Sequence, residues 1–178
     1  MMKNLVLPLI RYLLCAALAC STFVLPVQAE TRDFSGGLTL KKYGSGELRR
    51  FGFLVYEAQL WGAANPVEPP IALQLTYKRD IAGAKIVDAS VDQMRELGAN
   101  EKQLADWAGA MSRIFPNVKP GDQIIGLYQP GSATFFYNNR EIGQIRDAEF
   151  ARLFFGIWLD PRTSEPKLRS RLLQPGAG

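Results

Sequence analysis

The order in which the hydrophobic pattern changes along the chain limits the folds that this sequence can adopt. Apolar residues first alternate with a period of two, change to a helical period near Asp80, and return to short alternating stretches after Asp122. No strand–helix–strand alternation appears, so a doubly wound parallel sheet is disfavoured. We therefore expect an α+β open-faced sandwich, in which an antiparallel sheet is covered on one face by helices.

Alternating segments predict strands over 38–40, 48–61, 71–78, 123–129, 134–137 and 141–145. Helical periodicity predicts helices over 81–97, 100–115, 147–159 and 167–173. The glycines at 44 and 46 predict a turn between the first two strands, and residues 30–37 are expected to be a polar lead-in. Asn100 and Gln103 have the spacing of a capping box at a helix start.

The first 29 residues have the pattern of an export signal. Lys3 and Arg11 are followed by an uncharged apolar run over 12–25, and Ala29 ends a small-residue cleavage site. A membrane anchor is the alternative, but the run is shorter than the roughly 20 residues that span a bilayer. We predict a signal peptide over 1–29 that is cleaved after Ala29, and a single periplasmic domain over 30–178. Lipidation at Cys20, giving a lipoprotein, is a further possibility.

Composition excludes several chemistries. The chain has no histidine, which removes histidine bases, triads and histidine-containing zinc sites. Cys15 and Cys20, the two cysteines, leave with the predicted signal, so the mature chain has no thiol nucleophile, thiolate metal site or disulfide. Lys3 and Arg11 leave too, so 19 basic residues remain of the 21, against 17 acidic ones. Nucleic acid is therefore not an expected partner, and no metal or cofactor is expected.

Arg49 and Arg50 are the leading candidates for ligand binding. They precede an aromatic and aliphatic strand segment, so one of the two is expected to point to the interior. A half-buried guanidinium needs an anion, and its planar fork suits a carboxylate or an enolate. The alternatives are a protein carboxylate as partner, or two arginines in solvent. Tyr56 and Tyr77, also on strands, are candidate phenolic donors, or core residues with satisfied hydroxyls.

The acidic residues around the first helix have structural interpretations. Asp88 and Asp92 lie four apart, but Lys85 and Arg95 flank them at helical spacing, which is typical of a solvated, ion-paired face. Asp80 is expected to cap the helix, with Arg79 holding its carboxylate.

A series of segments in this chain resembles the chalcone isomerase family, specifically its exported bacterial branch. They are Gly-Ser-Gly-Glu-Leu-Arg-Arg-Phe at 44–51, Val-Tyr-Glu-Ala-Gln-Leu-Trp at 55–61, Leu-Thr-Tyr-Lys-Arg-Asp-Ile at 75–81, Phe-Pro-Asn-Val-Lys-Pro-Gly-Asp at 115–122, Phe-Tyr-Asn-Asn-Arg-Glu-Ile-Gly at 136–143 and Phe-Phe-Gly-Ile-Trp-Leu at 154–159. The resemblance covers nearly all of the mature chain. It implies the same open-faced sandwich and a ligand cleft between sheet and helices.

The resemblance also implies an activity that this chain is only partly equipped for. The plant enzymes cyclise chalcones with an arginine near the start of the long strand, which Arg49 or Arg50 matches. They also use a tyrosine and an asparagine on the first helix, but residues 81–97 contain neither. Val55 stands where the plant strand has threonine, and Phe154 and Phe155 stand near the last hydroxyl residue. Fatty-acid-binding relatives of the fold grip the carboxylate with an arginine and a hydroxyl.

Three hypotheses follow. The favoured one is a non-catalytic periplasmic domain that binds a small amphipathic anion such as a fatty acid, anchored by Arg49 or Arg50. The alternative is an isomerase or intramolecular lyase acting on a phenolic or unsaturated carbonyl compound, with Tyr56 or Tyr77 replacing the missing helix tyrosine. The third is a ligand-free structural partner of the envelope, which a cleft filled by Phe53, Trp107 and Phe154 would favour. The oligomeric state does not follow from the sequence.

Overall fold

A computed structural model describes residues 30–34, 37–63 and 65–174, and the predicted signal lies outside them. The described residues form one sheet of seven strands in chain order, in which every neighbouring pair is antiparallel. The strands are β1 (Thr31–Phe34), β2 (Leu38–Arg50), β3 (Phe53–Gly62), β4 (Ile71–Tyr77), β5 (Gln123–Gln129), β6 (Ser132–Tyr137) and β7 (Arg140–Ile145). The predicted antiparallel sheet is confirmed.

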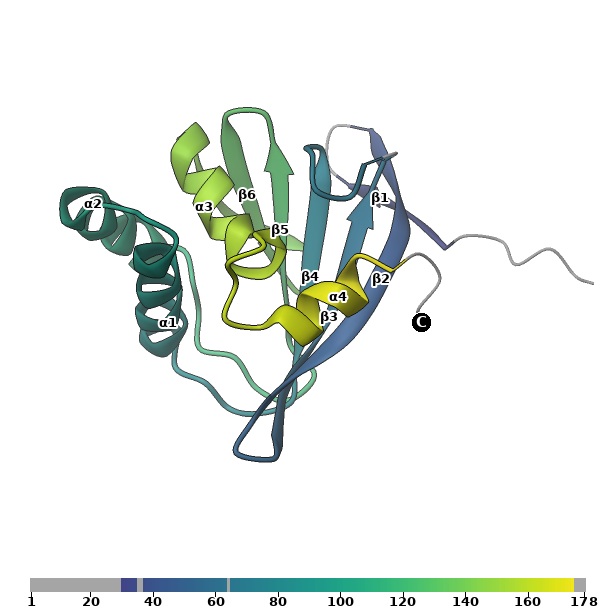
Figure 1. Ribbon diagram of the computed structural model, residues 1–178, viewed down its shortest axis with the longest axis horizontal. Coiled ribbons are helices and arrows are strands. Elements are labelled where there is room, and N and C mark those ends of the chain that lie inside the picture. Colours follow the sequence, from purple (N-terminus) through teal and green to yellow (C-terminus); the bar gives the residue numbers. More distant parts are fainter. Residues whose placement is uncertain (1–29, 35–36, 64, 175–178) are drawn as a thin grey trace, which may run out of the picture.

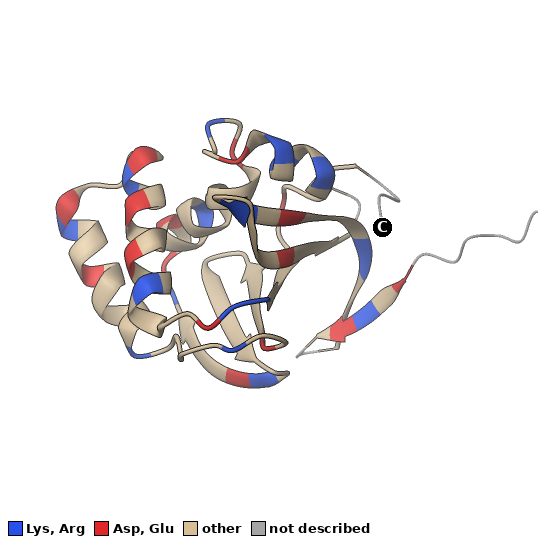
Figure 2. Cartoon of the chain, turned by 90° about the horizontal axis from the view of Figure 1, so that it is seen from below, with Lys and Arg blue, Asp and Glu red and all other residues tan. Residues whose placement is uncertain are grey.

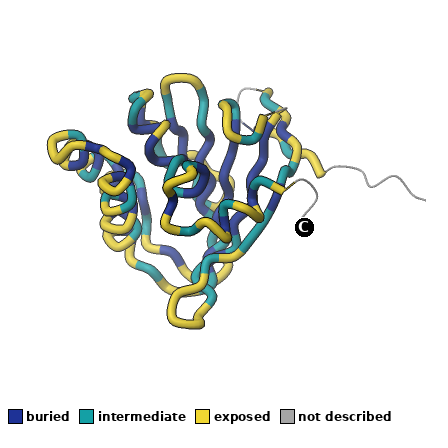
Figure 3. The backbone as a smooth tube through the Cα atoms, in the orientation of Figure 1, coloured by how far each residue is buried: buried dark blue, intermediate teal, exposed yellow. Residues whose placement is uncertain are grey.

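The helices gather on one face of this sheet, as predicted (Figure 1). They are α1 (Gly83–Glu96), α2 (Glu101–Ser112), α3 (Ala148–Leu159) and α4 (Pro166–Leu172). α3 lies against β5 and β6, α4 lies against β2 and β3, and α2 packs on α1 at the outer side. The main core fills the space between the sheet and these helices (Figure 3). None of the helices in the described ranges is long and apolar enough to cross a membrane.

The predicted turn at 44–46 is wrong, because these glycines lie inside β2. A β-carbon on Gly44 would lie 2.4 Å from the carbonyl oxygen of Leu172, and one on Gly46 would lie 2.8 Å from a methyl of Leu168. The two glycines therefore let α4 approach the strand closely, which is a packing requirement that the local sequence does not reveal.

The predicted single strand over 48–61 is also wrong, because the chain reverses at residues 51–52. Phe51 and Gly52 have φ values of 50° and 82°, and Arg50 pairs with Phe53 across the turn. Two consecutive residues with positive φ make a tight turn whose twist suits a β-hairpin. An aromatic residue at the first of these positions concealed the turn from propensity arguments.

The opposite face of the sheet carries a smaller second core. Leu40, Trp61, Ala72, Ile125 and Leu127 are buried there, together with Phe34 of β1. Residues 30–37 were predicted to be a lead-in, but 31–34 form the edge strand β1. Its Arg32 reaches across the outer face to hydrogen-bond Gln74 on β4 and Asn139 in the β6–β7 turn.

The helix starts follow local chemistry, with one exception. The capping box of α2 is confirmed, since Asn100 accepts from the backbone of Gln103 at 2.9 Å and the Gln103 side chain accepts in return. Contrary to the expectation from the sequence, Asp80 does not cap α1. The first turn of α1 is instead held by Asn117, which accepts from the Gly83 N–H at 2.9 Å.

Candidate ligand-binding site

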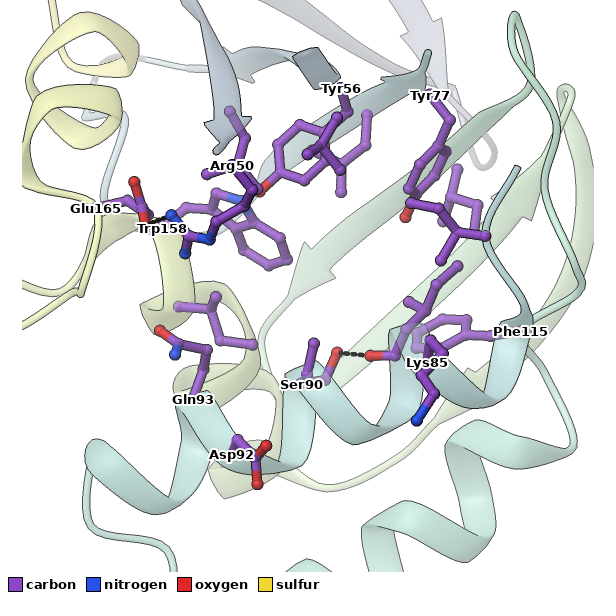
Figure 4. Close-up of a pocket in the computed structure, with 18 of the residues that line it drawn as sticks. Arg50, Tyr56, Tyr77, Lys85, Ser90, Asp92, Gln93, Phe115, Trp158 and Glu165 are labelled. Carbon is purple, nitrogen blue, oxygen red and sulfur yellow. Dashed lines mark hydrogen bonds and ion pairs between the residues drawn. The ribbon is translucent and has the colours of Figure 1, made fainter. Parts of the chain in front are cut away.

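A cavity of about 400 Å³ lies between the sheet and α1 (Figure 4). Its walls come from β2–β5, α1, α3 and the segment before α4, and most of its surface is apolar. The apolar lining consists of Leu48, Val55, Leu75, Ile81, Ile86, Ala89, Phe115, Ile124, Phe154 and Ile157. A volume of this size falls within the range of about 300–1,000 Å³ that is typical of sites for small molecules.

Polar side chains from three elements surround the cavity at one end. Arg50 at the end of β2 forms an ion pair with Glu165, and Ser164 donates a hydrogen bond of 2.6 Å to Gln93 on α1. We call these four residues the mouth. The Arg50 side chain is 51% exposed and Glu165 is 25% exposed, so the pair is accessible from solvent and from the cavity. The mouth thus combines a guanidinium with a carboxylate beside an apolar chamber.

Two tyrosines supply hydroxyl groups to the cavity wall. Tyr56 on β3 accepts a hydrogen bond of 2.9 Å from the Trp158 indole, which leaves its own proton free to be donated. Tyr77 on β4 is 3% exposed, and its hydroxyl points into the cavity without a hydrogen-bond partner among the described residues. Burial raises the pKa of both phenols well above the ordinary value, so both are neutral donors at physiological pH.

The structure separates the two candidate arginines. Arg50 lines the cavity, whereas Arg49 does not and pairs with Glu47 at 2.9 Å. The pairing of β2 with β3 shifts its register between Leu48 and Arg49. Counting alternation from the rest of the strand therefore could not decide which arginine faces the interior. Tyr56 and Tyr77 lie on the cavity wall with Arg50.

Sequence reasoning missed several residues that line the cavity. Ser90 and Gln93 lie on the helix that periodicity predicted over 81–97, but nothing in the sequence indicated that their side of the helix faces an unfilled space. Glu165 gave no signal, because it reaches the mouth from a segment more than 100 residues away from Arg50. Asp88 pairs with Lys85 at 3.1 Å on the exposed face of α1, as the sequence pattern indicated.

The residues expected to fill a ligand-free cleft do not do so. Phe53 is 60% exposed at the hairpin turn. Trp107 is buried elsewhere, where its indole donates to Asp147 at 2.9 Å, and Phe154 alone of the three lines the cavity. Within the described ranges, no three or more acidic side chains gather as metal ligands.

The two buried tyrosines predict a loss of stability at high pH. A phenol whose pKa is raised by folding contributes fully to the free energy of unfolding at a pH below its unfolded pKa of about 10. This contribution to stability is lost as the pH rises further. Each tyrosine adds a slope of at most about 1.4 kcal/mol per pH unit. Denaturant unfolding between mildly and strongly alkaline pH measures this slope. Tyr77→Phe is expected to make this slope shallower by up to about 1.4 kcal/mol per pH unit, and an unchanged slope would contradict burial of this phenol.

Together, the curled antiparallel sheet, the helical layer on one face and the cavity between them define an open-faced sandwich with an internal binding site. The family described as chalcone isomerase-like matches residues 34–174. The chain therefore belongs to the chalcone isomerase-like family.

The chain is also similar to two known proteins. An uncharacterized protein of Haemophilus influenzae is 28% identical over 133 residues, which are 73% of this chain and 66% of that protein. This chain thus spans just under two thirds of that relative's length. A crystal structure of a fatty-acid binding protein of Arabidopsis thaliana superposes with a TM-score of 0.58, covering 81% of this chain and 96% of the other. At 13% identity, that likeness establishes the shared fold.

Proposed function

We propose that this protein binds a fatty acid, or a similar small amphipathic anion, in the cavity without catalysing a reaction. The observation that carries the proposal is the apolar chamber with Arg50 at its mouth and two neutral phenols on its wall. An acyl chain would occupy the chamber, and its carboxylate would accept hydrogen bonds from Arg50. The fold shared with a plant protein named for fatty-acid binding agrees with this proposal.

The ion pair at the mouth specifies how a carboxylate would bind. The guanidinium of Arg50 has five N–H donors, so it can serve a ligand while it remains beside Glu165. The carboxylate of Glu165 would nevertheless repel an incoming anion, because like charges in close proximity raise each other's free energy. Glu165 is therefore expected to lower the affinity of the site for an anion.

Substitutions at the mouth are expected to change affinity in opposite directions. Arg50→Ala should weaken binding of a fluorescent fatty acid about tenfold or more, the loss expected for a hydrogen bond to a charged group. Glu165→Gln should strengthen binding several-fold, since it removes a competing charge but keeps the side-chain volume. Arg49→Ala is the matched control, because it removes the neighbouring guanidinium outside the cavity. Equal affinities for the Arg49 and Arg50 variants would contradict the proposed anchor.

A second candidate function is an isomerase acting on a phenolic or unsaturated carbonyl compound. Tyr56 and Tyr77 favour it, since two hydroxyl donors on the wall of a cavity that Arg50 also lines can polarise a ketone. Against it, α1 carries no tyrosine or asparagine to polarise the ketone. Turnover of a chalcone by the wild-type protein that is lost in Tyr77→Phe would establish this function instead.

The site of action is also a proposal. The sequence pattern of residues 1–29 supports export to the periplasm, where a cysteine-free mature chain would need no disulfide. Sequencing the amino terminus of the mature protein tests this directly, with cleavage after Ala29 as the expected result.

A further inference from the structure

The β2–β3 hairpin ends in two exposed phenylalanines. Phe51 is 98% exposed and Phe53 is 60% exposed. We call residues 49–53 the hairpin tip. The tip projects beyond the helices, and its backbone is coloured as exposed over the turn (Figures 1 and 3). Its two aromatic rings are therefore largely uncovered by the described part of the chain.

The conformation of Phe51 indicates that its aromatic ring makes a contact outside this chain. Its φ of 50° lies in the left-handed region, which bulky side chains disfavour and which asparagine or glycine adopts easily. The ring is almost fully exposed, so packing within the chain does not offset this strain. An aromatic residue at the very position where a turn favours asparagine points to an external contact.

Charges lie directly behind the aromatic end. Figure 2, which shows the molecule from below, has basic residues at the hairpin turn and acidic residues farther along both strands. The guanidinium of Arg79 lies 4.7 Å from the centre of the Phe53 ring, and it forms no ion pair within the described ranges. Three other cations nearby are each paired with a carboxylate: Arg49 with Glu47, Arg50 with Glu165, and Lys78 with Glu57.

This arrangement suits a lipid bilayer better than a folded protein. A stable protein interface buries about 800 Å² on each partner, whereas the tip offers two side chains on a narrow turn. A bilayer accepts single projecting apolar groups among its headgroups, and Arg79 can extend to a lipid phosphate from beside Phe53.

We propose that the hairpin tip docks this protein on the surface of a bilayer, with Phe51 and Phe53 inserted between the headgroups. Arg50 lines the mouth of the cavity and directly precedes Phe51, so docking places the mouth at the membrane. A fatty acid could then enter from the lipid phase. Entry of a fatty acid by this route rests on the proposed function, whereas the docking itself does not.

Co-sedimentation with vesicles of phosphatidylcholine and phosphatidylglycerol tests the proposal in the absence of any added fatty acid. Phe51→Asn is expected to reduce the vesicle-bound fraction about tenfold or more, because it removes the most exposed apolar group. Asparagine tolerates the left-handed conformation, so the melting temperature should stay the same or rise. Val67→Asn is the matched control, since Val67 is 44% exposed in the loop at the opposite end of β3. This variant should bind vesicles as the wild type does.

Three outcomes would overturn the proposal. The wild-type protein could fail to sediment with vesicles, or Phe51→Asn could bind them as well as the wild type does. Light scattering could instead show that the wild-type protein is a dimer and that Phe51→Asn is a monomer, which would assign the tip to self-association. None of these outcomes alters the fatty-acid titration of the Arg50 and Arg49 variants, so the failure of docking and the failure of the proposed function are distinguishable.

Discussion

Replacing Phe135 by alanine is expected to lower the free energy of unfolding by about 3–5 kcal/mol. Phe135 on β6 is fully buried, and its ring centre lies 5.0 Å from that of Phe115 and 5.2 Å from that of Phe154. Phe115 and Phe154 also line the cavity, so the substitution would leave a void where sheet, α3 and the cavity wall meet.

The neighbouring phenylalanine provides the control for this prediction. Phe136 faces the opposite side of the sheet, where it is only partly buried against the smaller core. Phe136→Ala should therefore lower the free energy of unfolding by much less, because less buried apolar area is lost with this ring. Denaturant titration of both variants measures the difference. Equal losses would mean that the two faces of the sheet contribute alike, contrary to the packing described here.

The substitution Gly44→Ala should cost about 3 kcal/mol or more. The added methyl would lie 2.4 Å from the Leu172 carbonyl oxygen and 2.5 Å from that of Arg171. Both atoms belong to the backbone of α4, so no side-chain rotation relieves the clash and the helix must move away from β2. The segment before α4 carries Glu165, so the mouth of the cavity is expected to loosen as well.

A second glycine-to-alanine substitution should act in the opposite direction. Gly109 lies within α2, where a β-carbon would meet only a flexible Arg113 nitrogen at 3.8 Å. Gly109→Ala is therefore expected to stabilise the protein by up to about 1 kcal/mol, because alanine has the better helix propensity. Thermal unfolding distinguishes the two variants. Destabilisation of similar size in both would show that the close approach of α4 is not the cause.

Much of the fold follows from local patterns in the sequence. The change of period near Asp80 separates strands from helices, and the capping box at Asn100 depends only on residues within one turn. Features that depend on distant contacts did not follow. Gly44 is a residue type that is typical of turns. In this structure it instead allows the close approach of a helix that lies more than 120 residues later in the chain. Phe51 conceals a real turn, because its residue type disfavours the conformation it adopts.

The candidate site was predictable to a similar degree. Strand patterns and the resemblance to chalcone isomerases offered Arg49, Arg50, Tyr56 and Tyr77 as candidates, and all of them except Arg49 line the cavity. The choice between Arg49 and Arg50 required the register shift in the β2–β3 pair, which no side-chain pattern encodes. Glu165 could not be anticipated, because its proximity to Arg50 depends on how the segment before α4 crosses the sheet.

A substitution that fills the cavity shows whether a fatty acid binds inside it. Ser90 faces the cavity from α1, and its hydroxyl bonds only to the Ile86 carbonyl within the same helix, at 2.8 Å. Ser90→Phe would therefore fill the cavity without leaving another group unpaired. Ser112→Phe is the matched control, since Ser112 makes the same local bond to Ala108 on the exposed face of α2.

Native mass spectrometry after incubation with a long-chain fatty acid gives the decisive comparison. The wild-type protein and Ser112→Phe are expected to carry one bound fatty acid per chain, and Ser90→Phe is expected to carry none. A wild-type protein that stays at its apo mass in excess fatty acid would show that the cavity does not bind a fatty acid. Equal loading of Ser90→Phe and the wild type would contradict it as well, because the ligand would then bind outside the cavity.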